Sequence, residues 1–413
     1  MNNPFYENPQ DLSNIILFTS LSWAVISLFI FQKVNSKKFI AYAYGFLFQM
    51  PLIYFVDKLA VKYSFWVYSD RTYQISLLLS WVILWSFILP SFKMKTHLTL
   101  LIALMIDLIY LPLLSPIFIL GENWLIAEVF CLSMILFPSL FLIKSYQEQK
   151  NLPLRVFAAI AIYLGWILLI VWDSILKIKD LEYIPLLFIS IYLGIFAVNE
   201  FYFRGGGTPL PFDKPKKFVT TGIYSYIQNP MQTSSFLFFI YLYLVSHDVN
   251  VLILLIVTFL FSNIFTSYSI SKEWDLDDNR SIYLKKVRKW LFRLSPFSTI
   301  RIKAFFKRDC NLCSNTENFF QSFNLDKVEY EDANKFFELM PGIKSIKRAV
   351  IILYEDDGNY QVEQGVRAMS YLFERINIFF AFFAWVVRLP LIDRCIQMFI
   401  DLCFGTRLIF HSS

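Results

Sequence analysis

The sequence predicts a polytopic α-helical membrane protein with about nine transmembrane helices, followed by a C-terminal cytosolic α/β domain. Hydrophobic residues make up 57% of the 413 residues and charged residues 17%, with a mean hydropathy of +0.51. This composition is too apolar for a soluble protein of this length. Long apolar runs follow one another as far as residue 270, whereas beyond residue 300 the runs shorten and alternating patterns appear.

The expected spans are apolar runs close to the roughly 20 residues that a helix needs to cross a ~30 Å hydrocarbon core. They lie at 12–32, 39–56, 74–92, 98–120, 124–143, 154–173, 182–202, 232–246 and 250–270. The eighth run is short, so we expect it to tilt, to pack inside the protein or to form a hairpin with the ninth. The first run follows Glu7 and Asp11 rather than a basic segment, so a removable signal peptide is not expected.

Basic residues gather in alternate loops. If the N-terminus lies outside, the cytoplasmic loops contain Lys33, Lys37, Lys38, Lys93, Lys95, Lys144, Lys150, Arg155, Arg204, Lys214, Lys216 and Lys217. The opposite loops contain Lys58, Lys62, Arg71, Lys177 and Lys179. The positive-inside rule therefore predicts an outside N-terminus and a cytoplasmic C-terminus, and we expect a bacterial inner membrane.

A basic stretch from Lys285 to Arg308 lies on the same predicted side. We expect it to rest on anionic lipid headgroups. No nucleic-acid-reading module accompanies it, so nucleic acid is not an expected partner.

The chain divides into three expected parts. Residues 1–150 form a five-span membrane region of unknown role, residues 151–300 hold four spans and a Gly/Pro-rich loop, and residues 301–413 form the α/β domain. The boundary falls near Pro296, because proline stops a preceding helix.

The Gly/Pro-rich loop is the segment with the clearest chemistry. The glycines at 205–207 and 222 permit close backbone approach. Prolines at 209, 211, 215 and 230 stiffen the path between two spans. A connector of this length without regular structure is usually functional or disordered. A stiff, glycine-opened loop can wrap a small polar ligand, although an ordinary connector is also compatible with the pattern.

Two motifs carry a resemblance. The first runs Gly-Thr-Pro-Leu-Pro-Phe-Asp-x-Pro, Val-Thr-x-Gly-x-Tyr-x-Tyr and Asn-Pro-Met between Gly207 and Met231. The second holds Glu273-Trp274, Tyr283, Trp290 and Ser295-Pro296. Together they resemble the isoprenylcysteine carboxyl methyltransferase and phospholipid methyltransferase superfamily over residues 155–300.

The resemblance implies a site for S-adenosyl-L-methionine (SAM) on the cytosolic side. Its lining residues would be Gly222, Tyr224, Gln228, Asn229 and Pro230, with Glu273 facing the ammonium or ribose of the cofactor. Gln228 stands where the superfamily commonly has arginine, and Lys272 stands where it often has an acidic residue. The substrate would be a lipid or isoprenoid that enters from the bilayer.

The tail has an alternating pattern of strands and helices. We expect strands at Ile302–Phe306 and Val328–Tyr330, a hairpin of Ala349–Tyr354 and Tyr360–Glu363, and helices at Cys313–Phe323 and Gly365–Arg375. This is a thioredoxin-like order of elements. Residues Ile376–Phe404 are apolar with embedded charges, and we expect helices that return to the bilayer or pack on the spans.

A Cys310-x-x-Cys313 pair lies at the predicted strand-to-helix turn. A helix N-terminus favours a thiolate there. Redox chemistry, an inert pair and a metal site are all open, although no second close pair of ligands supports a metal.

The Cys pair belongs to a wider pattern. Asp309, Cys310 and Cys313, with Trp385, Arg388-Leu-Pro390 and Gly405-Thr-Arg407, resemble the DCC thiol-disulfide oxidoreductase family over residues 302–408. The resemblance implies Cys310 and Cys313 as catalytic residues and a thiol redox partner.

Three functional hypotheses follow. The first is an integral membrane SAM-dependent methyltransferase with an attached redox domain. The second is a membrane-anchored thiol-disulfide oxidoreductase with a non-catalytic methyltransferase-like scaffold, and the third is a lipid-binding or partner-docking protein.

Asp107 lies inside the fourth expected span, where a carboxylate is costly. It is expected either to be functional or to pair with a Tyr or Lys of a neighbouring helix.

Overall fold

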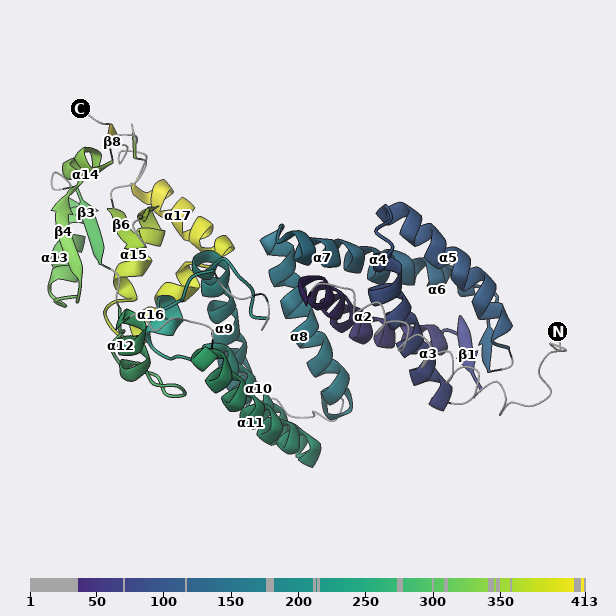
Figure 1. Ribbon diagram of the computed structural model, residues 1–413. Helices are drawn as coiled ribbons and strands as arrows, with labels where there is room; N and C mark the ends of the chain where they lie inside the picture. The colour runs from purple at the N-terminus through teal and green to yellow at the C-terminus, as the bar shows by residue number, and fades with distance from the viewer. Residues whose placement is uncertain are drawn as a thin grey trace. The chain divides into compact units, whose positions relative to one another are not determined.

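The chain forms two compact units in the computed structural model (Figure 1). Unit 1 comprises Met1–Leu176 with Gly206–Lys214, and unit 2 comprises Lys177–Gly205 with Pro215–Ser413. The structure describes residues 36–69, 71–115, 117–175, 182–210, 213, 216–272, 278–298, 301–307, 311–340, 345–346, 350–356, 359–404 and 410–411. The three-part division expected from the sequence stays a prediction.

Unit 1 is built mainly from apolar helices of different lengths. They are α2 (Ser36–Lys62), α3 (Arg71–Ile83), α4 (Leu89–Ser91), α5 (Thr96–Leu113), α6 (Trp124–Cys131), α7 (Phe137–Glu148) and α8 (Leu152–Ile175). Two π-helical turns, η1 (Leu84–Ile88) and η2 (Leu132–Leu136), join α3 to α4 and α6 to α7 without breaking the helix. A short antiparallel pair, β1 (Trp66–Tyr68) and β2 (Phe118–Leu120), links two helix ends.

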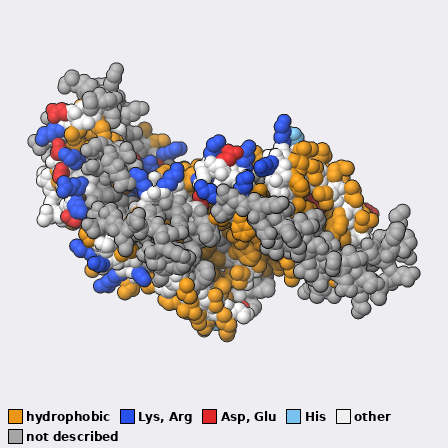
Figure 2. All heavy atoms as spheres, in the orientation of Figure 1, with side chains coloured by type: hydrophobic (Ala, Val, Ile, Leu, Met, Phe, Trp, Pro, Cys, Tyr) orange, Lys and Arg blue, Asp and Glu red, His pale blue; other side chains and the backbone are white. Residues whose placement is uncertain are grey.

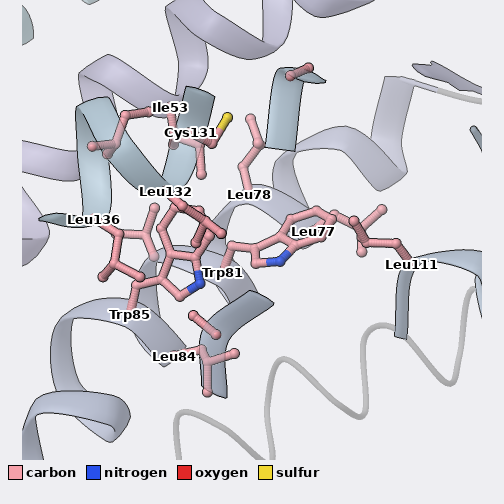
Figure 3. Packing of buried hydrophobic residues seen from close by; sticks show 14 of the residues in the cluster. Ile53, Leu77, Leu78, Trp81, Leu84, Trp85, Leu111, Cys131, Leu132 and Leu136 are labelled. Atoms are coloured by element: carbon pink, nitrogen blue, oxygen red, sulfur yellow. The ribbon is translucent and has the colours of Figure 1, made fainter. Parts of the chain in front are cut away.

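The core of unit 1 consists of aromatic and aliphatic side chains from these helices (Figure 3). Trp81 and Trp85 from α3 and η1 pack with Cys131, Leu132 and Leu136 from α6 and η2. The helices of unit 1 therefore bury apolar side chains against one another.

The loop segment of unit 1 is tied to α8. Asp213 forms an ion pair with Arg155, and both side chains are almost completely buried. The backbone N–H of Thr208 also donates to the Asp213 carbonyl at 3.1 Å. Burial raises the pKa of the Asp213 carboxyl, and the Arg155 guanidinium opposes that shift.

Six helices of the described residues are long and apolar enough to span a membrane, so the protein is an integral membrane protein. They are Lys37–Lys62, Tyr73–Ser91, Thr96–Leu113, Trp124–Glu148, Leu152–Trp172 and Ile184–Gly205. Each of the second to seventh expected runs overlaps one of these helices, but the fourth ends at Leu113 and not at residue 120, because Phe118–Leu120 forms β2. The run at 12–32 lies outside the described residues. Figure 2 shows hydrophobic side chains gathered over α5, where Leu101, Met105 and Ile109 are exposed.

Unit 2 begins with a membrane helix and a helical hairpin. Helix α9 (Ile184–Glu200) continues into the π-turn η3 (Phe201–Gly205), and the short η4 (Gly222–Ser225) precedes α10 (Pro230–Ser246). Helix α10 lies beside both α9 and α11 (Val249–Lys272) in Figure 1. Left-handed His247 (φ +50°) ends α10 just before α11, which agrees with the expected hairpin of the eighth and ninth runs.

Small residues let α9 and α10 approach closely. A Cβ atom on Gly194 would lie 2.8 Å from Ser234 Oγ. The Ser234 hydroxyl donates to the Ser190 carbonyl at 2.7 Å, and the Ser190 hydroxyl donates to the Ser234 carbonyl at 2.9 Å. Such reciprocal bonds between helices satisfy hydroxyl groups that lipid would leave unpaired.

After α12 (Asp278–Lys286), the C-terminal part carries a four-stranded mixed sheet. Its elements are β3 (Ile302–Phe306), α13 (Asn311–Gln321), β4 (Val328–Asp332), α14 (Ala333–Leu339), β6 (Val350–Asp356), β7 (Asn359–Gln364) and α15 (Gly365–Phe373). The strand order is β4-β3-β6-β7, with β3 parallel to β4 and antiparallel to β6. Strands β5 (Ser345–Ile346) and β8 (Phe410–His411) form a separate pair. All six expected elements of the tail are present, with bounds shifted by a few residues.

Two helices follow α15, namely α16 (Ile378–Val387) and α17 (Pro390–Phe404). Ile378, Ala381 and Trp385 of α16 share one apolar cluster with Leu193 and Phe196 of α9. Of the two expected arrangements for this segment, α16 therefore packs on a candidate span.

Candidate functional site

The Gly/Pro-rich loop and the segment after α12 are joined by backbone hydrogen bonds. The N–H groups of Arg293 and Phe297 donate to the carbonyls of Tyr226 and Ser225 at 3.1 and 2.9 Å. The N–H of Gln228 donates to the Arg288 carbonyl at 3.0 Å. The two motifs are thus brought side by side, at the end of α9.

Gly222 occupies a position that only glycine fits. Its φ is +59°, a left-handed backbone that disfavours other residues. A Cβ atom there would lie 2.3 Å from Cδ of Glu200, the last residue of α9. The backbone of the loop therefore lies directly against a buried carboxyl group.

The Glu200 carboxylate is the centre of a buried polar network. The Thr221 hydroxyl donates to Oε2 at 3.0 Å, and Nη1 of Arg388 donates to Oε1 at 3.4 Å. Arg388 also forms an ion pair with Glu374. All three charged residues are at most 8% exposed. The Arg388 guanidinium is thus shared by two buried carboxylates and offsets part of their charge.

Aromatic rings border the same network. The Arg388 guanidinium lies 4.4 Å from the centroid of the Tyr371 ring, and the Arg204 guanidinium lies 4.9 Å from it. Cation–π contacts of this kind hold a guanidinium in a fixed place. The rings of Tyr224 and of Phe201, the residue after Glu200, lie 5.1 Å apart.

Buried tyrosines of the loop and of α12 donate hydrogen bonds to nearby backbone carbonyls. The Tyr283 hydroxyl donates to the Tyr224 carbonyl at 2.8 Å, and the Tyr226 hydroxyl donates to the Glu374 carbonyl at 2.6 Å. Burial, followed by the nearby Tyr283 and Glu200, raises the pKa of Tyr224 well above its ordinary value. Burial likewise raises the pKa of Tyr283. These phenols stay neutral at physiological pH, so they are unsuited to act as bases.

Gln228 has a structural contact that the sequence did not suggest. Its Nε2 donates to the Leu284 carbonyl at 2.9 Å and to the Val287 carbonyl. These carbonyls lie in the last turn of α12 and just beyond it, where helices leave backbone acceptors unpaired. The side chain therefore caps α12 and ties it to the loop.

We expect Gln228→Ala to destabilise the protein by about 1–3 kcal/mol, because buried carbonyls lose their donor. Gln228→Glu should lower stability further, because a carboxylate oxygen would then face the carbonyl oxygens of Leu284 and Val287 without a proton to share. Thermal unfolding in detergent measures both changes. Gln232→Ala, a half-buried glutamine on α10, is the matched control and should change stability by about 0.5 kcal/mol or less. Equal melting temperatures for Gln228→Ala and Gln232→Ala would contradict the capping role.

The other residues singled out from the sequence are distributed as follows. Asn229 is 7% exposed and precedes α10 with its side chain making no capping bond, and Pro230 is the first residue of that helix. Cys313 lies in α13 and is buried beside Phe305 and Phe336. Glu273 and Cys310 lie outside the described residues. No group of three or more potential metal ligands gathers in the described part of the chain.

Glu200 and its pairing with Arg388 were not expected from the sequence. Glu200 ends an apolar run, where a carboxylate needs a partner, and that is the signal that could have selected it. Arg388 was singled out as part of the pattern that resembles a redox family, yet its guanidinium contacts Glu200 at the end of α9.

The class of protein is therefore a polytopic membrane protein with a buried carboxylate–guanidinium network at a glycine-opened loop. Residues 186–269 match the family model described as phospholipid methyltransferase (PEMT). The match begins in α9, includes the loop and α10, and ends in α11. No curated protein and no solved structure matches the chain. The comparisons give no support for the expected DCC resemblance of residues 302–408.

Proposed function

We propose that the protein is an integral membrane SAM-dependent methyltransferase acting on a lipid-phase substrate of the phospholipid or isoprenoid type. The observation that carries the proposal is the phospholipid methyltransferase match over residues 186–269, which contains both Glu200 and Gly222. The proposed orientation has the loop and the C-terminus in the cytoplasm, as the distribution of basic residues favours.

The residues present fit SAM. A buried carboxylate such as Glu200 suits the ammonium or ribose hydroxyls of the cofactor, and Glu273 is proposed to act in the same way. Gly222 lets the backbone of η4 lie against the Glu200 carboxyl, and Tyr224, Asn229 and Pro230 would form the wall of the cofactor site. When bound, SAM supplies an electrophilic methyl group.

The protein's contribution to methyl transfer is then positioning. Fixed side chains align an acceptor with the methyl group, and such alignment supplies much of a rate enhancement. The described site has neutral, buried phenols rather than a free base. We therefore propose an acceptor that is already nucleophilic, such as an amine or a carboxylate. It would enter from the bilayer, since α9 and α10 border the loop.

SAM binding to the purified protein in detergent tests the proposal by calorimetry. Wild type should bind saturably, and Glu273→Ala should lose binding. Glu182→Ala removes an exposed glutamate just before α9 and should bind as wild type does. Absence of binding by wild type, or equal binding by Glu273→Ala, would overturn the assignment.

A second candidate function is thiol-disulfide exchange. It is favoured by the order β3-α13-β4 followed by β6-β7-α15, and by Cys313 in the helix after β3. This is the thioredoxin-like order, in which a cysteine pair at that turn is positioned for attack by a thiolate. The α9–α11 region would then be a non-catalytic scaffold. Thiol turnover that Cys310→Ser abolishes, in a protein that fails to bind SAM, would favour this alternative.

A further inference from the structure

Three acidic side chains are buried inside the candidate spans of unit 1. Asp57 belongs to α2, Asp107 to α5 and Glu128 to α6. Their exposures are 0%, 0% and 4%. An ionisable group inside a membrane span is costly, and its partners indicate which charge state the protein stabilises.

Asp57 has the partners of a carboxylate. Oδ1 accepts from Trp66 Nε1 at 2.9 Å and from the Tyr68 hydroxyl at 2.6 Å. Oδ2 accepts from Gln74 Nε2. Three donors on one carboxyl group satisfy the ionised form, which can only accept hydrogen bonds.

Asp107 and Glu128 differ from Asp57 because their main partner is each other. The two carboxyl groups lie within hydrogen-bonding reach of each other, and Trp81 Nε1 donates to Asp107 Oδ1 at 2.8 Å. Among the described residues, Asp107 Oδ2 and Glu128 Oε1 have no other donor. Two carboxyl groups form a hydrogen bond only when one of them carries a proton. From the sequence, Asp107 was expected either to be functional or to pair with a Tyr or Lys, and the partners that the structure gives it are an indole and a second acid.

The acid pair has no counter-ion among the described residues. The interactions recorded for both carboxyls come from Trp81 and from each other, with none from a lysine or arginine of the described residues. The other titratable groups that act nearby are Asp57 on α2, Cys131 on α6 and Tyr68 on β1. All of these are neutral or negative, so a second negative charge on the acid pair would be opposed.

A cavity of ≈ 40 Å³ adjoins Asp107. Trp81, Ser80 and Tyr110 line it together with Leu77, Leu84 and Ile106. A water molecule requires about 10–15 Å³ of such volume, so the cavity has room for water. Its lining is mostly apolar, and a water molecule inside it would meet the acid pair at the fully buried Asp107.

We propose that Asp107 and Glu128 form a proton-binding site of the first membrane region, separate from the methyltransferase site. The pair holds one proton between two carboxyl oxygens. The held proton exchanges with water by replacement. As it leaves, a proton from water is taken up, so the pair keeps one proton and one negative charge, and Asp107 keeps the Trp81 indole hydrogen bond.

Infrared spectroscopy of the purified full-length protein tests this site, because a protonated carboxyl group has a carbonyl stretching band that a carboxylate lacks. Wild type at neutral pH should show this band, and it should shift when water is exchanged for D₂O. The double variant Asp107→Asn/Glu128→Gln should lose it. Asp57→Asn should keep it, since Asp57 has the donors of an ionised group.

Circular dichroism and gel filtration check that each amide variant remains folded. If the double variant fails to fold, deuterium exchange of the wild-type band still decides the question. The proposal is overturned if wild type has no such band at neutral pH, if the band does not respond to D₂O, or if Asp57→Asn removes it. Because SAM binding is not part of this measurement, its outcome is independent of the proposed function.

Discussion

Gly222→Ala is expected to weaken SAM binding by more than tenfold and to lower thermal stability. The left-handed backbone alone costs about 1–2 kcal/mol for a residue with a side chain. The added methyl group would also lie 2.3 Å from Glu200 Cδ, so the carboxyl must move away from Thr221 and Arg388. Calorimetric titration and thermal unfolding in detergent measure the two effects.

A double-mutant cycle separates backbone strain from collision with the carboxyl group. In a Glu200→Ala background the obstructing atoms are gone, so Gly222→Ala should lose less stability there than in wild type. Only the cost of the left-handed backbone should remain. An equal loss in both backgrounds would show that Glu200 does not occupy the space over Gly222.

Arg388→Ala is the substitution with the largest expected effect on stability. It leaves Glu200 and Glu374 buried without their shared guanidinium, and breaking a buried pair in this way costs about 3–5 kcal/mol. It also removes the cation from the Tyr371 ring. Thermal or denaturant unfolding in detergent should show a clear loss, together with weaker SAM binding if the network shapes the loop.

Two comparison variants sharpen this expectation. Arg388→Lys keeps the charge but lacks the planar fork that reaches two carboxylates, so its stability should fall between wild type and alanine. Arg394→Ala removes an exposed arginine from α17 and should cost about 0.5 kcal/mol or less. A similar small cost for Arg388→Ala would mean that the network contributes little to folding.

The spans and the tail could be predicted because their signals are local. An apolar run of about 20 residues identifies a membrane helix without knowledge of its neighbours. The alternation in Ile302–Phe306 likewise separates two faces, one packed with Phe320 and the other with Phe336. The π-helical turns η1 and η2 were not predicted, because the hydrophobic pattern of the sequence does not distinguish a regular α-helix from one that contains a π-helical turn.

The candidate site was only partly predictable. The loop could be recognised from its glycines and prolines, because these residue types directly change the backbone dihedrals that the chain can adopt. The ion pair of Glu200 with Arg388 joins positions 188 residues apart. No local pattern encodes such a contact. The same holds for Asp107 and Glu128, where an acid in a span pointed to a partner but not to which one.

The path of the chain limits how the protein can be divided for study. Residues 206–214 belong to unit 1, whereas the residues immediately before and after them belong to unit 2. A single cut between residues 176 and 177 therefore keeps unit 2 whole but leaves unit 1 without residues 206–214. A gene fragment starting at residue 177 would contain Asp213 without Arg155, its buried counter-ion. If the protein is divided there, we expect unit 1 to need the second piece, because residues 206–214 of that piece complete it.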